Sequence, residues 1–203
     1  MNTFEQGLLR YLKEDQLKTI QSAKIGIGGA GCLGSNAAMI LVRSGVKHLE
    51  IVDKDVIDAS NLNRQQYYTD EIGLPKVSVT QKRLLAINPD AEIIVHQTEW
   101  SENNAPSFFK DCRIIVEAFD QADWKYRFVD YYQDKTDYVV SGNGMAGLLE
   151  KKPMQIKRVG NIFMVGDYST DTRQGHPPMA PRVTACAAMM AECVLDLTLG
   201  IIK

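Results

Sequence analysis

KIGIGGAGCLGSN, residues 24–36, carries the clearest structural signal in the chain. A short run typical of a β-strand ends in glycine, and the pattern Gly-x-Gly-x-x-Gly follows as Gly29, Gly31 and Gly34. The residues from there to Gly45 are apolar nearly all round, which is typical of a buried helix. The first N–H groups of such a helix lack partners and attract anions. The pattern therefore predicts a nucleotide bound by its phosphates, without saying which nucleotide.

Strands and helices alternate along the rest of the chain. The spacing of apolar residues predicts strands at 48–53, 91–97, 113–120 and 137–143, and helices at 76–88, 121–133 and 182–200. A Gly-Asn pair inside 154–167 predicts a β-hairpin. This order favours a single domain over residues 1–203. We expect an α/β fold with a Rossmann-like, mostly parallel sheet, helices on both faces, and a C-terminal hairpin and helix.

Composition and charge argue against several classes of protein. Of the 203 residues, 45% are hydrophobic and 24% are charged, and the formal net charge is -2. This charge gives no electrostatic reason to expect nucleic acid or a membrane surface as partner. No apolar run is long enough to span a bilayer, and the N-terminus is unlike a signal peptide. We expect a cytoplasmic protein whose cysteines are free thiols: Cys32, Cys112, Cys186 and Cys193.

The segment 51–68 bears on the choice between NAD and ATP. Asp53 follows a predicted strand, where an acid can hold ribose hydroxyls in either case. In this chain a second acid, Asp55, and a polar cluster that contains Arg64 follow, and Lys76 stands at the start of the next helix. Arginine can fork onto two phosphate oxygens and lysine acts as a point charge. Each cation alone would be an ordinary surface charge, but together they favour a triphosphate.

These motifs resemble those of the ubiquitin-activating-type adenylyltransferases, the ThiF/MoeB-like family, over about residues 23–199. The matching stretches are GAGCLGSN, VDKDVIDASNLNRQ, GLPK followed by INP, and EAFDQADWK. The chain is similar to the short form that lacks the C-x-x-C pairs of longer relatives, so no zinc site is expected. EAFD and PPMAPRV most resemble the thiamine-synthesis branch. The resemblance implies ATP-dependent adenylation of the C-terminal glycine of a small ubiquitin-like sulfur-carrier protein ending in Gly-Gly, with release of pyrophosphate.

The resemblance also implies roles for individual residues. The phosphates of ATP would lie against Gly29, Gly31 and Gly34, and the ribose would lie on Asp53. The residues implied to approach the phosphates are Asn61, Arg64, Gln65 and Lys76. Asp120 corresponds to the acid that binds Mg²⁺, and Lys125 to a basic residue usual on the following helix. Arg10 corresponds to an arginine that reaches the partner's phosphates in a homodimer. The implied catalytic set is Arg64, Lys76, Asp120 and Arg10.

Other functions stay open on the sequence alone. An NAD-dependent oxidoreductase fits the glycine turn and Asp53 but leaves Arg64, Lys76 and Asp120 without a role. A non-catalytic nucleotide-binding protein is a further alternative. Within the family, the substrate could instead be a molybdopterin-type carrier, a peptide or a tRNA base, although the near-neutral charge argues against tRNA.

Several residues have a structural and a chemical interpretation. Cys32 occupies a place where relatives commonly have glycine, and a tolerated substitution is favoured over a reactive thiol. The stripe Trp124, Phe128 and Tyr131 is expected in the core or in a subunit contact. Cys186 and Cys193 are expected to pack inside the last helix. The histidines, His48, His96 and His176, are expected to be structural or surface residues. The loop 166–181 is a candidate cover for the carrier's tail, with a merely flexible connection as the alternative.

Overall fold

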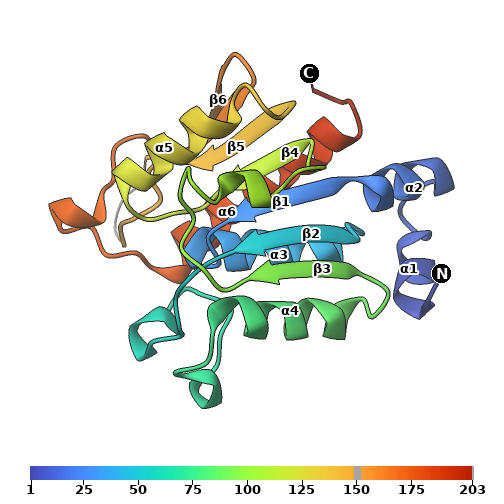
Figure 1. The fold of residues 1–203 in the computed structure, drawn as a ribbon, viewed down its shortest axis with the longest axis horizontal. Coiled ribbons are helices and arrows are strands. Elements are labelled where there is room, and N and C mark those ends of the chain that lie inside the picture. Colours follow the sequence, from blue (N-terminus) through green and yellow to red (C-terminus); the bar gives the residue numbers. More distant parts are fainter. Residues whose placement is uncertain (149–151, 203) are drawn as a thin grey trace.

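A twisted sheet runs through the centre of the fold (Figure 1). In this computed structural model the described residues, 1–148 and 152–202, form seven strands in the order β3-β2-β1-β4-β5-β7-β6. Their bounds are β1 Lys24–Gly28, β2 His48–Val52, β3 Glu92–His96, β4 Ile114–Glu117, β5 Tyr138–Gly142, β6 Gln155–Val159 and β7 Ile162–Gly166. Neighbouring strands pair in parallel except β6, which is antiparallel to β7. The predicted Rossmann-like, mostly parallel sheet is therefore confirmed.

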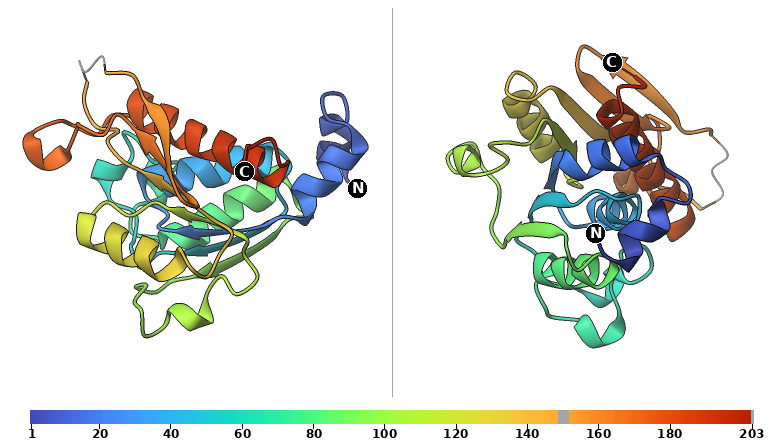
Figure 2. Two further views of the ribbon diagram at one scale, coloured as in Figure 1. Left: turned by 90° about the horizontal axis from the view of Figure 1, so that it is seen from above. Right: turned by 90° about the vertical axis from the view of Figure 1, so that its right-hand side faces the viewer.

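Helices cover both faces of the sheet, as predicted (Figure 2). On one face lie α3 (Cys32–Arg43), α4 (Lys76–Ile87) and α6 (Ala180–Thr198), with α3 packed against α6. On the other face lies α5 (Ala122–Tyr132), next to β4 and β5. Short 3-10 turns complete the connections, at Ala59–Asn61, Thr69–Glu71, Ala105–Ser107 and Thr172–Gln174. No helix in the described ranges is long and apolar enough to cross a membrane.

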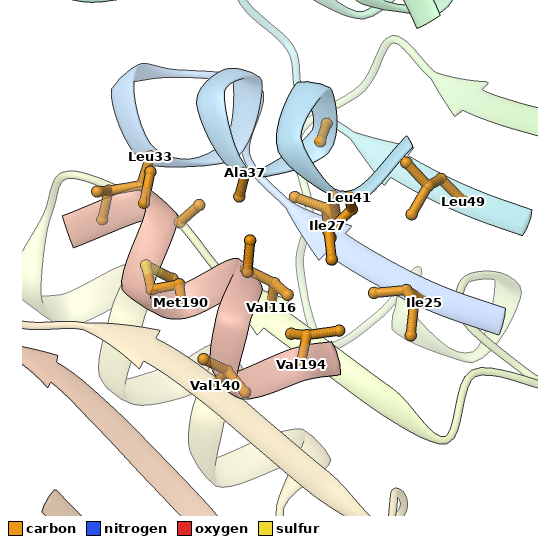
Figure 3. Packing of buried hydrophobic residues seen from close by; sticks show 14 of the residues in the cluster. Ile25, Ile27, Leu33, Ala37, Leu41, Leu49, Val116, Val140, Met190 and Val194 are labelled. Atoms are coloured by element: carbon orange, nitrogen blue, oxygen red, sulfur yellow. The ribbon is translucent and has the colours of Figure 1, made fainter. Parts of the chain in front are cut away.

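The largest apolar core lies between the sheet and the pair α3 and α6. Figure 3 shows Leu33, Ala37 and Leu41 of α3 meeting Met190 and Val194 of α6 beside the sheet. The central strands are buried on both faces, which explains why their sequences are continuously apolar rather than alternating. The predicted packing of α6 is confirmed, because the side chains of its two cysteines, Cys186 and Cys193, are fully buried.

A second, aromatic core covers the opposite face. It is built from α5 and the segment before β4, and its buried rings are Trp100, Phe108, Phe109, Phe128 and Tyr132. Phe128 is fully buried, and Trp124 and Tyr131 pack partly buried against it. The predicted aromatic stripe on 121–133 is therefore a core stripe. Two of the histidines are also structural, since His48 pairs with Glu92 and His96 with Glu50 on neighbouring strands.

The structure adds two helices that the sequence pattern does not predict. They are α1 (Thr3–Leu8) and α2 (Glu14–Ser22), which precede β1. Both are short, and α2 buries only Leu17 and Ile20, so its apolar face is too narrow to give a recognisable helical periodicity. The predicted hairpin is confirmed, with β6 and β7 joined by the Gly-Asn turn and Gly160 at a φ of 62°.

Candidate active site at the carboxyl ends of the strands

The strand order reverses between β1 and β4, because β2 follows on one side of β1 and β4 lies on the other. Ligands of open α/β sheets bind beyond the carboxyl ends of the strands at such a point. A cleft of about 460 Å³ lies there, lined by α3, β5 and the loop after β7. A smaller hollow of about 120 Å³ lies beyond β2. Phe119 and Asp120, just after β4, line both.

The glycine turn after β1 brings the start of α3 to the cleft. Gly29 has a φ of 98°, which suits glycine, and the chain then turns directly into the helix. A methyl group on Gly34 would lie 1.8 Å from the carbonyl oxygen of Gly29, so only glycine allows turn and helix to approach this closely. A methyl group on Gly31 would meet nothing within 4 Å. Gly31 is the N-cap of α3, and no described side chain caps the helix there, so its N-terminus is open to an anion.

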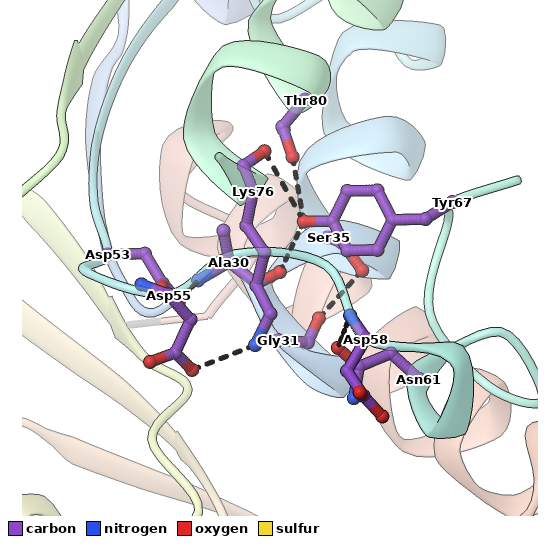
Figure 4. Close-up of polar contacts among 10 residues, drawn as sticks. All are labelled: Ala30, Gly31, Ser35, Asp53, Asp55, Asp58, Asn61, Tyr67, Lys76 and Thr80. Carbon is purple, nitrogen blue, oxygen red and sulfur yellow. Dashed lines mark hydrogen bonds and ion pairs between the residues drawn. The ribbon is translucent and has the colours of Figure 1, made fainter. Parts of the chain in front are cut away.

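Asp53 connects the glycine turn to the end of β2. Its carboxylate accepts hydrogen bonds from the backbone N–H of Ala30 at 2.6 Å and of Asp55 at 2.7 Å (Figure 4). Burial raises the pKa of Asp53, and these hydrogen bonds and Lys76 only partly oppose that effect. Asp53 and Asp55 both line the smaller hollow.

Lys76 is brought to the site through Asp55. It is the first residue of α4, is buried, and donates to Asp55 Oδ2 at 2.8 Å. Tyr67, which belongs to none of the sequence motifs described above, connects the glycine turn to α4. Its hydroxyl donates to the carbonyl of Ala30 at 2.6 Å and lies 3.1 Å from the hydroxyl of Thr80 (Figure 4). No sequence motif predicts this contact, because it joins residues that are 37 positions apart.

The polar cluster after β2 folds back onto α3. Asn36 of α3 donates to the carbonyl of Arg64 at 2.9 Å, which holds the cluster against the helix. The Arg64 guanidinium lines the cleft and donates through Nη1 to Ser60 and Asn63. Its Nε is buried and finds no hydrogen-bond partner among the described residues, and the same holds for Gln65 Oε1. A buried, unpaired guanidinium N–H beside an open helix N-terminus is suited to an anionic ligand.

Of the three remaining predicted residues, Asp120 lies at the site, Asn61 lies in the turn beside it, and Arg10 lies elsewhere. Asn61 lies in the 3-10 turn Ala59–Asn61, where its side chain accepts from the backbone N–H of Asp58. The Asp120 carboxylate is exposed between the two hollows and makes no hydrogen bond to any described residue. Arg10 is not brought to this site, because it lies between α1 and α2, before the amino end of β1. Its predicted action across a dimer remains a prediction.

Lys125 and Glu117 form a buried ion pair at the base of the cleft. Glu117 is the last residue of β4 and its side chain is fully buried, whereas Lys125 lies on α5 and lines the cleft. The two ammonium–carboxylate distances are 3.0 and 2.8 Å. Ser141 of β5 also donates to this carboxylate, at 2.6 Å. The sequence motifs point to Lys125 but not to Glu117 and Ser141, which look like ordinary strand residues.

Cys32 lines the cleft at the first position of α3. Burial raises the pKa of its thiol, although Arg64 and Lys125 oppose the effect. A thiol that is protonated at neutral pH is a weak nucleophile. This favours the interpretation of Cys32 as a tolerated substitution. The other cysteines are buried and free.

An ion pair under the loop 166–181 holds the far wall of the cleft. Asp167 is fully buried, pairs with Arg182, and accepts from the backbone N–H groups of Ser169 and Thr170. Arg182 in turn donates to the carbonyl of Ala146 at 2.9 Å. Burial alone would raise the pKa of Asp167, but the hydrogen bonds outweigh it and lower the pKa to about 2.

Because the pKa of Asp167 is lowered in the folded protein, we expect the free energy of unfolding to fall in acid. Asp167 has an ordinary pKa of 3.8 and a folded-state pKa of about 2. Its contribution, about 2.5 kcal/mol, is fully present above pH 5 and is lost as the pH falls towards 2. Asp167→Asn should therefore lower the free energy of unfolding at pH 7 by about 2 kcal/mol and flatten its decline in acid. Urea unfolding from pH 7 to pH 3 measures both, with Asp134→Asn, at an exposed position, as the control. Equal slopes for wild type and Asp167→Asn would contradict the assignment.

Comparisons with known proteins agree with this fold. The model of the ThiF family matches residues 5–201. The sulfur carrier protein ThiS adenylyltransferase of Bacillus subtilis is 37% identical over 106 residues, which cover 51% of this chain and 32% of that protein. The tRNA threonylcarbamoyladenosine dehydratase of the same organism is 30% identical over 158 residues, covering 77% of this chain and 62% of that protein. The chain thus spans a third to three fifths of the length of these curated relatives.

Among solved structures, the E. coli tRNA N6-threonylcarbamoyladenosine dehydratase in complex with AMP superposes with a TM-score of 0.84. It is 23% identical, and the match covers 97% of this chain and 94% of that one. E. coli MccB with ATP superposes with a TM-score of 0.72 at 18% identity, covering 93% of this chain and 60% of that one. At these identities the likeness establishes the fold.

Proposed function

The chain belongs to the ThiF family, and we propose that it is an ATP-dependent adenylyltransferase that activates the C-terminal glycine of a small ubiquitin-like sulfur-carrier protein. The observation that carries the proposal is the arrangement at the junction of the two hollows. There the unpaired Nε of Arg64 and the open N-terminus of α3 lie along the same cleft as the exposed carboxylate of Asp120. A triphosphate needs several cationic groups and an acid that can hold a cation.

ATP fits the residues around this junction. The smaller hollow, with Asp53 and two tryptophan rings, would take the nucleoside, and the phosphates would lie across the glycine turn towards Arg64. No group of three or more His, Cys, Asp or Glu side chains in the described ranges could hold a metal by itself. A magnesium ion on Asp120 would therefore take its other ligands from phosphate oxygens and water, which is usual for Mg²⁺. When bound, Mg²⁺ would balance charge on the phosphates.

The proposed reaction needs little chemical help from side chains. The carboxylate of the carrier attacks the α-phosphorus of ATP, the bond to the bridging oxygen breaks, and pyrophosphate leaves, so that an acyl-adenylate remains. A terminal carboxylate is already ionised at neutral pH and needs no general base. The protein would position the two reactants and balance the charge of the leaving pyrophosphate through Arg64 and Lys76.

Thiamine synthesis is the proposed pathway, and ThiS-like proteins are the proposed carriers. The motifs EAFD and PPMAPRV support this branch, as does the similarity to proteins named as adenylyltransferases of sulfur carriers in Bacillus subtilis and Thermus thermophilus. The proposed assembly is a homodimer. Because Arg10 lies near the amino end of β1, it could reach a nucleotide only in a second copy. Light scattering tests this assembly.

A second candidate substrate is a modified base in tRNA. It is favoured by the similarity to the Bacillus subtilis dehydratase over 77% of this chain, the longer of the two alignments with proteins of that organism described above. Activation of a carboxylate by ATP would be the common chemistry. The net charge of -2 provides little attraction for tRNA, so the carrier remains the proposal.

Isotope exchange tests both candidates. The protein is incubated with Mg-ATP, labelled pyrophosphate and a small carrier ending in Gly-Gly, and label entering ATP is measured. We expect exchange that depends on the carrier, that is absent with a carrier shortened by its last glycine, and that NAD⁺ does not inhibit. ATP turnover stimulated by tRNA, without exchange on any carrier, would favour the second candidate. No stimulation by either would sink the adenylyltransferase proposal.

A further inference from the structure

The Lys125 ammonium has no hydrogen left for a substrate. It donates to both carboxylate oxygens of Glu117, at 3.0 and 2.8 Å, and to the backbone carbonyl of Gly142, at 3.0 Å. A lysine has three N–H donors, and these three contacts use all of them. Lys125 lines the cleft with 22% of its side chain exposed, but its charge is directed to the protein. It would have to break a buried ion pair to bind a phosphate.

Both oxygens of the Glu117 carboxylate also have hydrogen-bond partners within the protein. Besides the two bonds from Lys125, it accepts from Ser141 Oγ at 2.6 Å and from the backbone N–H of Phe119 at 2.7 Å. Its side chain is fully buried, so removal of either charge would leave the other uncompensated inside the protein. Such a network holds its members in one arrangement because each lost bond is costly.

The network joins three elements at the edge of the cleft, which Lys125 and Gly142 line. Glu117 ends β4, Ser141 and Gly142 end β5, and Lys125 lies on the second turn of α5. The bond from Phe119 to Glu117 closes a tight turn, and Asp120 is the next residue. The orientation of Asp120, which has no partner of its own among the described residues, therefore depends on this turn.

We propose that Glu117 and Lys125 are positioning residues of the adenylation site. They hold Asp120 at the junction of the two hollows and keep the ends of β4 and β5 at a fixed separation under the larger cleft. Lys125 acts on the nucleotide through Glu117 and the turn, not by contact with a phosphate. This inference rests on the proposed binding of ATP, but it does not depend on which substrate is adenylated.

Nucleotide binding, measured apart from turnover, tests the role. Both tryptophans of the chain, Trp100 and Trp124, line the smaller hollow, so intrinsic fluorescence reports ATP binding. The quantity of interest is the ratio of the Kd for ATP in EDTA to the Kd at saturating Mg²⁺. We expect this ratio to be about tenfold or more for the wild type and close to one for Asp120→Asn, because Mg²⁺ would couple ATP to that carboxylate.

Glu117→Gln and Lys125→Met should each reduce that ratio at least about threefold while changing the Kd in EDTA less than about threefold. The double variant should be no worse than the more affected single variant, because both act on one network. Lys135→Met, which removes an exposed ammonium just beyond α5, is the matched control. If Lys125→Met does not fold, the double variant and Ser141→Ala, which removes one neutral donor, make the same test.

Two results would overturn the inference. One is a tenfold or greater loss of ATP binding in Lys125→Met, with and without Mg²⁺, that Glu117→Gln does not share, since this would make Lys125 a phosphate ligand. The other is an unchanged ratio in all of these variants, or a wild-type ratio of one. Failure of the proposed function looks different. The ratio would then respond as expected while no carrier stimulates pyrophosphate exchange.

Discussion

Asp120→Asn is expected to lower carrier-dependent pyrophosphate exchange at saturating ATP by at least about a hundredfold. The Asp120 carboxylate is exposed at the junction of the two hollows and bonds to no other described residue, so the structure gives it no part in holding the fold. Asparagine has nearly the same shape but carries no charge for a cation. The melting temperature should therefore change by less than about 2 °C, a shift typical of surface substitutions.

Asp123→Asn is the matched control for this prediction. Asp123 is exposed in the first turn of α5, three residues from Asp120, and lines neither hollow. Its loss changes the net charge by the same amount, so it should cost at most a few-fold in exchange. Equal losses in both variants would point to a general effect of charge. Full exchange by Asp120→Asn would remove Asp120 from the site.

Gly34→Ala is expected to destabilise the protein by about 3 kcal/mol or more. The added methyl group would lie 1.8 Å from the carbonyl oxygen of Gly29 and 2.9 Å from its carbonyl carbon. These are backbone atoms in the turn that α3 packs against, so they cannot rotate aside as a side chain can. Urea unfolding followed by circular dichroism measures the loss.

Gly31→Ala separates packing from ligand binding. The added methyl group meets no protein atom within 4 Å, so the free energy of unfolding should change by less than about 1 kcal/mol. The same open space is where the phosphates of ATP are proposed to pass, and the Kd for ATP should rise about tenfold or more. If Gly31→Ala binds ATP as the wild type does, the phosphates do not cross the turn at this residue. Equal stability of the two glycine variants would contradict the close approach at Gly34.

Much of this fold follows from local patterns in the sequence. The strand, turn and helix of 24–45 were predictable because glycine spacing and continuous apolarity act within a few residues. The Gly160-Asn161 turn was predictable for the same reason, since it joins strands by two residues. The helices α1 and α2 were not, because short helices are stabilised mainly by tertiary contacts, such as those of Leu17 and Ile20.

Only part of the candidate site could be predicted from local patterns in the sequence. Asp53, Arg64 and Asp120 stand out because a polar residue at the end of a buried strand, or in a dense polar cluster, needs an explanation. Tyr67 and Glu117 do not stand out. Their importance comes from partners that are 37 residues away, in Ala30, and 24 residues away, in Ser141.

The sequence alone was therefore sufficient to predict the class of fold, the glycine turn and the family, since each depends on residue types at short fixed spacings. Only the tertiary structure decided which partners the charged and polar side chains have. It separated Arg10 from the candidate site of its own chain and raised the pKa of the Cys32 thiol by burial. It also directed the Lys125 ammonium to Glu117 rather than to open space. Burial and hydrogen-bond satisfaction depend on which strands and helices become neighbours, and no local spacing contains that information.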